Sequence, residues 1–245
     1  MADLHMHSLR LQHARLFEFA RRRHLPIQSI DLGYIVHCAL RELFGESAPA
    51  PFFVSDERGA FAKVLGYAAK SNEELVRDAA TFADPSVHEI PEKGSHASKR
   101  LPEFESGQRL GFEVRTLAVV RLGRGATKRL PGHEADAFLA EVSKVGPDVK
   151  VDREAVYRNW FLAQIARLGG ASVVGDPRIA SYQRVRFTRR TQGESRMAHG
   201  SEQPAVTFTG TLEVTDPIAF GNLLARGIGR HRAFGFGMML LKRPA

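Results

Sequence analysis

The sequence predicts an α+β protein of two tandem ferredoxin-like (RRM-like) domains, with a glycine-rich loop near the C-terminal end. Its 245 residues are enough for two domains of about 100–130 residues each. Both halves show the same succession of strand, helix, two strands, helix and strand, which is the ferredoxin-like order. A polar segment, residues 91–107, separates the halves and contains two prolines and two glycines. We therefore expect domains over residues 1–106 and 107–245.

The elements of the first half follow from hydrophobic periodicity and from residues that begin or end helices. Leu4–Gln12 is expected to be a strand, although Leu9 and Leu11 interrupt the alternation of Leu4, Met6 and Ser8. The predicted helices cover 13–23, the segment from a cap at Ser29 or Asp31 through Leu43, and the segment from a cap at Ser71 to about Ala83. The other predicted strands are 51–54 and 60–69, which a turn at 56–59 joins, and a short strand over 87–90.

The second half repeats this order with clearer boundary signals. Asp216 caps a short helix whose first residue is Pro217, and Gly169-Gly170 ends an earlier one. Between the strands we expect a basic loop over 123–132 and a polar excursion over 192–203. The predicted strands are 110–122, 172–174, 182–190, 205–214 and 236–241, and the predicted helices are 134–145, 153–168 and 217–226.

The charge of the chain is basic and unevenly distributed. Its formal net charge is +8 and its pI is near 10. The first 110 residues hold 14 basic and 15 acidic side chains, whereas the remainder holds 21 and 12. Most of the basic excess is arginine, which binds phosphate through its planar fork and stacks on bases. The second half therefore favours a polyanionic partner, with nucleic acid first among them.

Several classes of protein are excluded or disfavoured by composition. The only cysteine, Cys38, cannot form an internal disulfide or a cysteine-based zinc site. The chain has no long apolar run and no secretory signal pattern at its N-terminus. We expect a cytoplasmic protein with no membrane partner and no metal or other cofactor. His5 and His7 lack an evident third ligand, so we interpret them as structural.

The predicted helix that ends at Leu43 carries the first group of candidate catalytic residues. Tyr34, His37 and Arg41 have the spacing i, i+3, i+7, so they share a face roughly opposite the apolar one. Histidine transfers protons near neutral pH, tyrosine orients a reacting group, and arginine stabilises charge on phosphate oxygens. The alternative interpretation is that all three are ordinary surface residues.

The glycine-rich loop holds the second group of candidate residues. Residues 227–237 read GIGRHRAFGFG and lie between a predicted helix and the last strand. Glycines allow backbone N–H groups to approach a phosphate or base closely. Gly229, Arg230, His231 and Arg232 are therefore candidate RNA-binding residues, and a turn built only for packing is the alternative.

Clusters of basic residues supply further candidate phosphate contacts. Each member alone could equally be a solvated surface residue. The candidates outside the glycine-rich loop are Arg23, Arg121, Arg124, Lys128, Arg129, Arg184, Arg186, Arg189 and Arg190.

The C-terminal stretch resembles the CRISPR repeat-RNA endoribonucleases of the RAMP superfamily. It is most similar to the CasE branch of type I-E systems and to its type IV relatives. The resemblance rests on residues 208–214, the helix that begins with Asp216-Pro217, and the glycine-rich loop. It extends to Tyr34 and His37, which fall where that family carries its catalytic tyrosine and histidine.

The resemblance implies metal-independent cleavage of hairpins in precursor CRISPR RNA. The ribose 2′-hydroxyl attacks the adjacent phosphate, leaving a 2′,3′-cyclic phosphate and a 5′-hydroxyl. It also implies that the protein stays on the product as a subunit of an effector complex. On this basis His37 is the general acid or base, Tyr34 orients the phosphate or the 2′-hydroxyl, and Arg41 stabilises charge. Some family members carry a lysine after the histidine; here Arg41 or the cluster Arg21–Arg23 are the candidates.

Two other functions remain open at this stage. The chain could be a non-catalytic subunit that binds CRISPR RNA, with Tyr34 and His37 incidental. It could also be an unrelated two-domain nucleic-acid adaptor, which would show no preference for a repeat hairpin.

Overall fold

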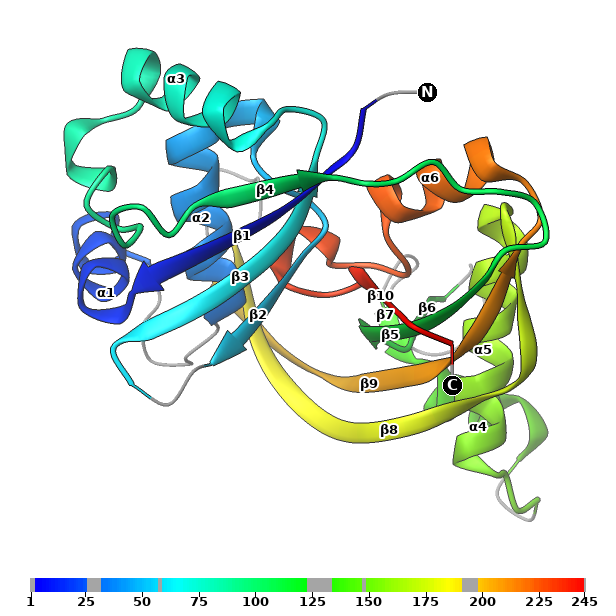
Figure 1. Ribbon diagram of the computed structural model, residues 1–245. Helices are drawn as coiled ribbons and strands as arrows, with labels where there is room; N and C mark the ends of the chain where they lie inside the picture. Colours follow the sequence, from blue (N-terminus) through cyan, green and yellow to red (C-terminus); the bar gives the residue numbers. More distant parts are fainter. Residues whose placement is uncertain are drawn as a thin grey trace.

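The computed structural model describes residues 3–25, 32–56, 59–122, 134–146, 149–190 and 198–244. Its first half is a four-stranded antiparallel sheet with the order β2-β3-β1-β4 (Figure 1). The strands are β1 (His5–Gln12), β2 (Phe52–Asp56), β3 (Phe61–Ala68) and β4 (Ala97–Arg100). The helices are α1 (His13–Arg22), α2 (Leu32–Phe44) and α3 (Asn72–Phe82), with 3₁₀ turns η1 (Gly45–Ser47) and η2 (Pro85–Val87).

The second half forms another antiparallel sheet, with the order β10-β5-β9-β8. Its strands are β5 (Arg109–Leu117), β8 (Ala171–Arg190), β9 (Ala198–Val214) and β10 (Met239–Lys242). Its helices are α4 (Ala137–Val145), α5 (Arg153–Leu168) and α6 (Pro217–Arg226), and its 3₁₀ turn is η3 (Arg232–Phe234). A two-stranded ribbon, β6 (Val119–Arg121) with β7 (Glu134–Asp136), is inserted. In both sheets the first strand lies between the last and the third, so the ferredoxin-like prediction is confirmed twice.

Local sequence signals account for several helix boundaries. Ser71 forms a capping box with Glu74 at the start of α3. Asp216 accepts hydrogen bonds from two backbone N–H groups of α6, whose first residue is Pro217. Gly169 ends α5 with a φ of 74°. These boundaries agree with the sequence prediction because they depend on neighbouring residues only.

Other elements differ from the prediction. The expected strand over 87–90 is wrong, because 85–87 is a 3₁₀ turn and the fourth strand lies at Ala97–Arg100, inside the predicted linker. Residues 134–136 are strand and not helix. The two predicted strands 172–174 and 182–190 are one long strand, β8. Part of the expected excursion, residues 198–203, belongs to β9, and 191–197 lie outside the described residues.

The two halves pack against each other through the first sheet. Leu9 and Leu11 are buried in the core formed with α1, α2 and α3. Met6, Leu65 and Tyr67 belong instead to the core of the second half. The Tyr67 hydroxyl donates a 2.8 Å hydrogen bond to the backbone carbonyl of Met239 in β10. The first sheet is therefore apolar on both faces where the halves meet.

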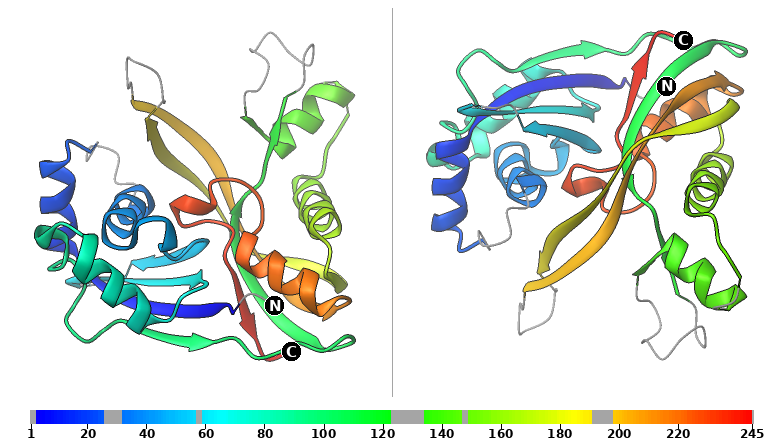
Figure 2. Two further views of the ribbon diagram at one scale, coloured as in Figure 1. Left: turned by 90° about the horizontal axis from the view of Figure 1, so that it is seen from above. Right: turned by 90° about the horizontal axis from the view of Figure 1, so that it is seen from below.

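The chain after α6 brings the second half to the first. Figure 2 shows this segment, drawn in red, reaching from α6 toward α2 at the centre of the molecule. Turn η3 contacts both α2 and β2. None of the helices that the structure describes is both long and apolar enough to cross a membrane.

Candidate functional site

Helix α2 presents the predicted catalytic side chains away from its own core. Its buried face includes Ile35, Val36 and Ala39. Tyr34 and His37 lie outside this face and are half-buried, while Arg41 is exposed. The predicted arrangement of the helix is confirmed, because its apolar residues pack in the core of the first half and Tyr34, His37 and Arg41 lie outside that core.

Phe234, in the glycine-rich loop, contacts the candidate catalytic residues of α2. Its ring meets the His37 ring edge-on, with centroids 5.2 Å apart and planes at 87°. The Tyr34 ring lies 5.6 Å from the same phenylalanine. This edge-to-face geometry is favourable for aromatic pairs. The catalytic candidates from the first half therefore form a single site with the loop from the second half.

The loop keeps its shape because glycines fit where side chains do not. Gly229 has a φ of +80°, and a Cβ there would lie 2.5 Å from the Thr116 hydroxyl. Thr116 itself donates a hydrogen bond to the Ile228 carbonyl. Gly237 has a φ of +77°, and its backbone N–H donates to the Arg115 carbonyl at 2.7 Å. Packing thus requires glycine at 229, and contact of Gly229 with RNA stays a prediction.

Glu134 holds two basic residues of the loop. Its carboxylate oxygens lie 2.5 Å from Nε of Arg230 and 2.5 Å from Nε2 of His231. The hydrogen bond from His231 is the main reason that the pKa of Glu134 falls to about 2, with Arg230 contributing further. His231 adopts a left-handed backbone conformation with a φ of 59°. This carboxylate anchors the loop to β7, opposite Arg121 in the β6–β7 ladder.

The surroundings of His37 favour its neutral form. Burial lowers the pKa of His37 below the usual 6.5, and the positive charge of Arg41 lowers it further. A neutral imidazole accepts a proton, so near neutral pH the geometry supports a general base at this position.

Two of the arginines considered as cationic partners for His37, Arg41 and Arg23, are in ion pairs. Arg41 donates hydrogen bonds to both carboxylate oxygens of Glu46, one of them at 3.1 Å. Arg23 pairs with Glu42 on α2. Both are exposed surface pairs that water and salt screen, so an approaching phosphate can replace either carboxylate.

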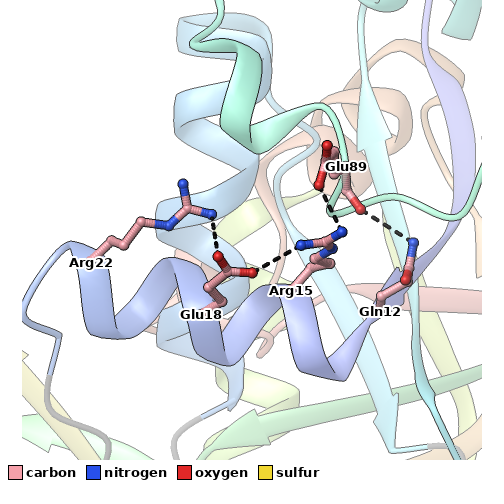
Figure 3. Close-up of polar contacts among 5 residues, drawn as sticks. All are labelled: Gln12, Arg15, Glu18, Arg22 and Glu89. Carbon is pink, nitrogen blue, oxygen red and sulfur yellow. Dashed lines mark hydrogen bonds and ion pairs between the residues drawn. The ribbon is translucent and has the colours of Figure 1, made fainter.

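Helix α1 carries further basic residues in a network of acidic partners (Figure 3). Glu18 pairs with Arg15 at 3.1 Å and with Arg22 at 3.2 Å. Arg15 also pairs with Glu89 at 2.9 Å, and Gln12 donates to the Glu89 backbone carbonyl. These contacts tie α1 to the segment that follows η2.

The remaining RNA-binding candidates occupy several places. Val185 packs with Phe234 around the cluster that contains Phe236. Because side chains alternate along a strand, the exposed Arg184 and Arg186 lie on the opposite face of the β8–β9 ribbon. Arg184 pairs with Glu202 at 3.1 Å. Arg189 and Arg190 end β8, but their side chains lie outside the described residues, as do Arg124, Lys128 and Arg129 entirely.

Two residues of the site were not among the sequence candidates. Phe234 stands between the two Gly-X-Gly units of the loop, and its central position was the available signal. Glu134 was assigned only to a helix start, and no local pattern connects it to Arg230 and His231. Their pairing depends on the β6–β7 ribbon and appears only in the folded chain.

His7 has a structural environment, as predicted. It is fully buried, and its Nε2 donates to the Lys70 carbonyl at 2.9 Å. Its Nδ1 therefore accepts from Nε2 of His96, 3.0 Å away. Burial is the main reason that the pKa of His96 falls to about 4. Within the described parts of the chain, no three His, Cys, Asp or Glu side chains are close enough to hold a metal ion.

Comparison with known proteins gives a family match over nearly the whole chain. A family model described as "CRISPR associated protein" matches residues 4–243. A search of curated proteins gives no significant match.

Solved structures share the fold. A CRISPR endoribonuclease Cse3 bound to a 19 nt RNA is 22% identical, with a TM-score of 0.63 and coverage of 99% of this chain and 100% of that one. Thermus thermophilus Cse3, bound to an RNA representing a pre-cleavage complex, is 19% identical, with a TM-score of 0.61 and coverages of 98% and 99%. A chain of a CRISPR RNA-guided surveillance complex is 15% identical, with a TM-score of 0.56 and coverages of 97% and 99%.

Proposed function

Since this chain belongs to the CRISPR associated protein family, we propose that it is an endoribonuclease that cleaves repeat hairpins in precursor CRISPR RNA without a metal ion. The observation that carries this proposal is the meeting of Tyr34 and His37 with the glycine-rich loop at Phe234. The RNA-bound Cse3 structures of the same fold support it.

The proposed reaction is an intramolecular transesterification. Neutral His37 removes the proton from the ribose 2′-hydroxyl, and the 2′-oxygen forms a bond to the adjacent phosphorus. The bond from phosphorus to the 5′-oxygen breaks, that oxygen takes up a proton from water, and the His37 imidazolium returns its proton to the solvent. The products are a 2′,3′-cyclic phosphate and a 5′-hydroxyl. Because the nucleophile belongs to the substrate, positioning supplies much of the rate.

Tyr34 and Arg41 assist in this proposal. The Tyr34 side chain lies one helical turn before His37, so it reaches the same linkage and orients the phosphate or the 2′-hydroxyl. Arg41 follows His37 by one turn and stabilises negative charge on the phosphate oxygens after leaving Glu46.

The same proposal extends to binding and assembly. The predicted arginines of the second half contact the hairpin backbone, since A-form stems are recognised mainly through shape and phosphates. The similarity to a chain of a surveillance complex supports retention of the product as a complex subunit. A cytoplasmic location is part of the proposal, supported by the single cysteine of the chain.

The first prediction concerns His37→Ala. We expect cleavage of a cognate repeat RNA in EDTA to fall by at least about 100-fold, as for loss of a general acid or base. Binding should change by less than about 1 kcal/mol, because the proton moves only in the transition state. Single-turnover cleavage and binding of uncleavable 2′-deoxy RNA measure the two effects.

His88→Ala is the control, since His88 is exposed and lies beyond η2. Cleavage by His37→Ala at the wild-type rate would remove this residue from the mechanism. If the wild-type protein binds repeat RNA tightly but leaves it intact, the protein is a non-catalytic RNA-binding subunit. Equal binding of a scrambled hairpin would indicate a general nucleic-acid adaptor.

A further inference from the structure

A hollow of about 720 Å³ lies beside the glycine-rich loop. The C-terminal ends of α5 and α6 form part of its wall, and Ala50 and Pro51 from the first half close another side. Among the residues that the structure describes, four guanidinium groups and one carboxylate, that of Glu134, line it. The arginines are Arg167, Arg226, Arg230 and Arg232, and we call this hollow the arginine pocket.

Three of the four arginines have no acidic partner among the described residues. Arg230 pairs with Glu134. Arg167 donates to the neutral Gln164 side chain at 2.9 Å, and Arg232 donates to the Arg226 backbone carbonyl. Burial and the neighbouring charges of Arg226, Arg167 and Arg230 lower the pKa of Arg232. The positive charges of these three arginines therefore repel one another, with no carboxylate paired to any of them among the described residues.

Helix ends account for only part of this charge. Arg167 and Arg226 lie in the last turns of α5 and α6, where basic residues offset the carbonyl ends. Each helix end carries roughly half a negative charge. Two ends thus offset about one of the four positive charges, and Glu134 offsets a second. The excess remains positive, which is the requirement for binding an anion.

The arginine pocket adjoins the catalytic candidates. Phe234 lines the pocket and also contacts the rings of His37 and Tyr34. An RNA strand whose scissile linkage lies at His37 therefore passes Phe234 with its neighbouring nucleotides. The arginine pocket is a local hollow of about 720 Å³, a size that suits part of a single strand.

We propose that the arginine pocket binds the sugar–phosphate backbone of the single-stranded nucleotides that adjoin the scissile linkage, an inference that rests on the proposed function. Arg167, Arg226 and Arg232 contact phosphate oxygens through their planar forks. Arg167 and Arg226 thereby acquire a role separate from binding of the hairpin stem.

The test compares RNAs that differ only in their flanks. One is a hairpin that ends at the cleavage site; the others add a short single-stranded flank at the 5′ or the 3′ side, with a 2′-deoxy nucleotide that prevents cleavage. Fluorescence anisotropy at several salt concentrations gives the Kd and its salt dependence. In the wild type, at least one flank should tighten binding about 10-fold.

The double variant Arg167→Gln/Arg226→Gln should lose this gain. Its log Kd should depend less steeply on log salt, by about 1.4 for two single-strand phosphates, and only for the flanked RNA. The charge-preserving variant Arg167→Lys/Arg226→Lys should retain the salt slope. The matched control is Arg77→Gln/Lys99→Gln, which removes two exposed charges from α3 and β4 and should leave the flank effect intact.

Three results would overturn the inference. In the first, the flank tightens binding by the Gln variant as much as by the wild type. In the second, the Gln variant loses as much affinity for the bare hairpin as for the flanked RNA. In the third, the Gln and Lys variants share a fall in melting temperature that accounts for the lost affinity. Failure of the proposed function gives a different result, because the wild type would then show no preference for any repeat hairpin or no cleavage of a 2′-hydroxyl substrate.

Discussion

At the scale of the residue, the position of His37 determines its protonation. It is half-buried on the face of α2 that meets the glycine-rich loop, with Phe234 against its ring and Arg41 one turn away. Both burial and the neighbouring positive charge disfavour the imidazolium form. A histidine that stays neutral below its usual titration range is suited to accept the proton of the 2′-hydroxyl.

The pH dependence of cleavage tests this environment. Cleavage should be constant above pH 6.5 and should fall on the acidic side, with a midpoint below 6.5, because only neutral His37 accepts a proton. In Arg41→Gln the second cause of the lowered pKa disappears, so the midpoint should rise. The plateau rate should fall about 100-fold if Arg41 also stabilises the phosphate. Single-turnover rates across pH measure both effects, and an unmoved midpoint would contradict them.

Phe234 should act through His37 and Tyr34. Phe234→Ala removes the ring that fixes their orientation, so the cleavage rate should fall about 10–100-fold while hairpin affinity changes little. Phe234→Tyr keeps the ring and should retain most of the rate. Phe82→Ala is the control, because Phe82 is 85% exposed on α3. A proportional loss of rate and affinity in Phe234→Ala would indicate an RNA-binding role instead.

At the scale of the element, the glycine-rich loop is held in place from both sides. Thr116 and Arg115 of β5 bind its backbone, and Glu134 of β7 binds two of its side chains. The loop therefore carries Phe234 on a fixed support. Glycines occur in this loop because its backbone takes positive φ angles and packs too closely for a side chain at Gly229 and Gly237.

Two glycine-to-alanine substitutions test whether the loop requires glycine for its packing. Gly229→Ala places a Cβ 2.5 Å from the Thr116 hydroxyl at a positive φ, so it should destabilise the protein by about 2–3 kcal/mol. Gly221→Ala in α6 meets no atom within 4 Å and should stabilise by up to about 1 kcal/mol. Denaturant unfolding measures both, and equal stabilities would show that the loop relaxes freely.

At the scale of the whole molecule, neither half contains the complete site. Tyr34 and His37 belong to the first half, and Phe234 and the arginine pocket belong almost wholly to the second. The halves are joined by a continuous core that includes Tyr67 of β3 and Met239 of β10. The relative position of the two sheets therefore sets the geometry of the site.

Tyr67→Phe tests this connection. The substitution keeps the ring but leaves the buried Met239 carbonyl without its 2.8 Å partner, which should cost about 1–3 kcal/mol. Thermal unfolding should remain one cooperative transition in both proteins, because the core spans both halves. Tyr182→Phe, at a residue 37% exposed whose hydroxyl accepts a hydrogen bond from Arg153, should cost less than Tyr67→Phe, because water reaches the partner left behind. Two separate transitions in the wild type would contradict a shared core.

The elements that sequence reasoning missed are those whose partners lie far along the chain. Strand β4 is polar and mostly exposed, so it has no alternation, and its pairing with β1 alone defines it. The irregular pattern of β1 arises because Leu9 and Leu11 face the helices of the first half while Met6 faces the second half. Hydrophobic periodicity identifies a strand with one buried face, and it does not identify a strand whose two faces are both buried.

The amino-acid order alone determined the ferredoxin-like succession of elements, the caps of α3 and α6, the shared face of Tyr34 and His37, and the basic character of the second half. These properties depend on neighbours within a few residues. The tertiary structure decided that Phe234 lies against His37, that Glu134 anchors the loop, and that four arginines enclose one hollow. Such contacts require two cores to dock, and docking depends on the burial of surfaces that are separated along the chain.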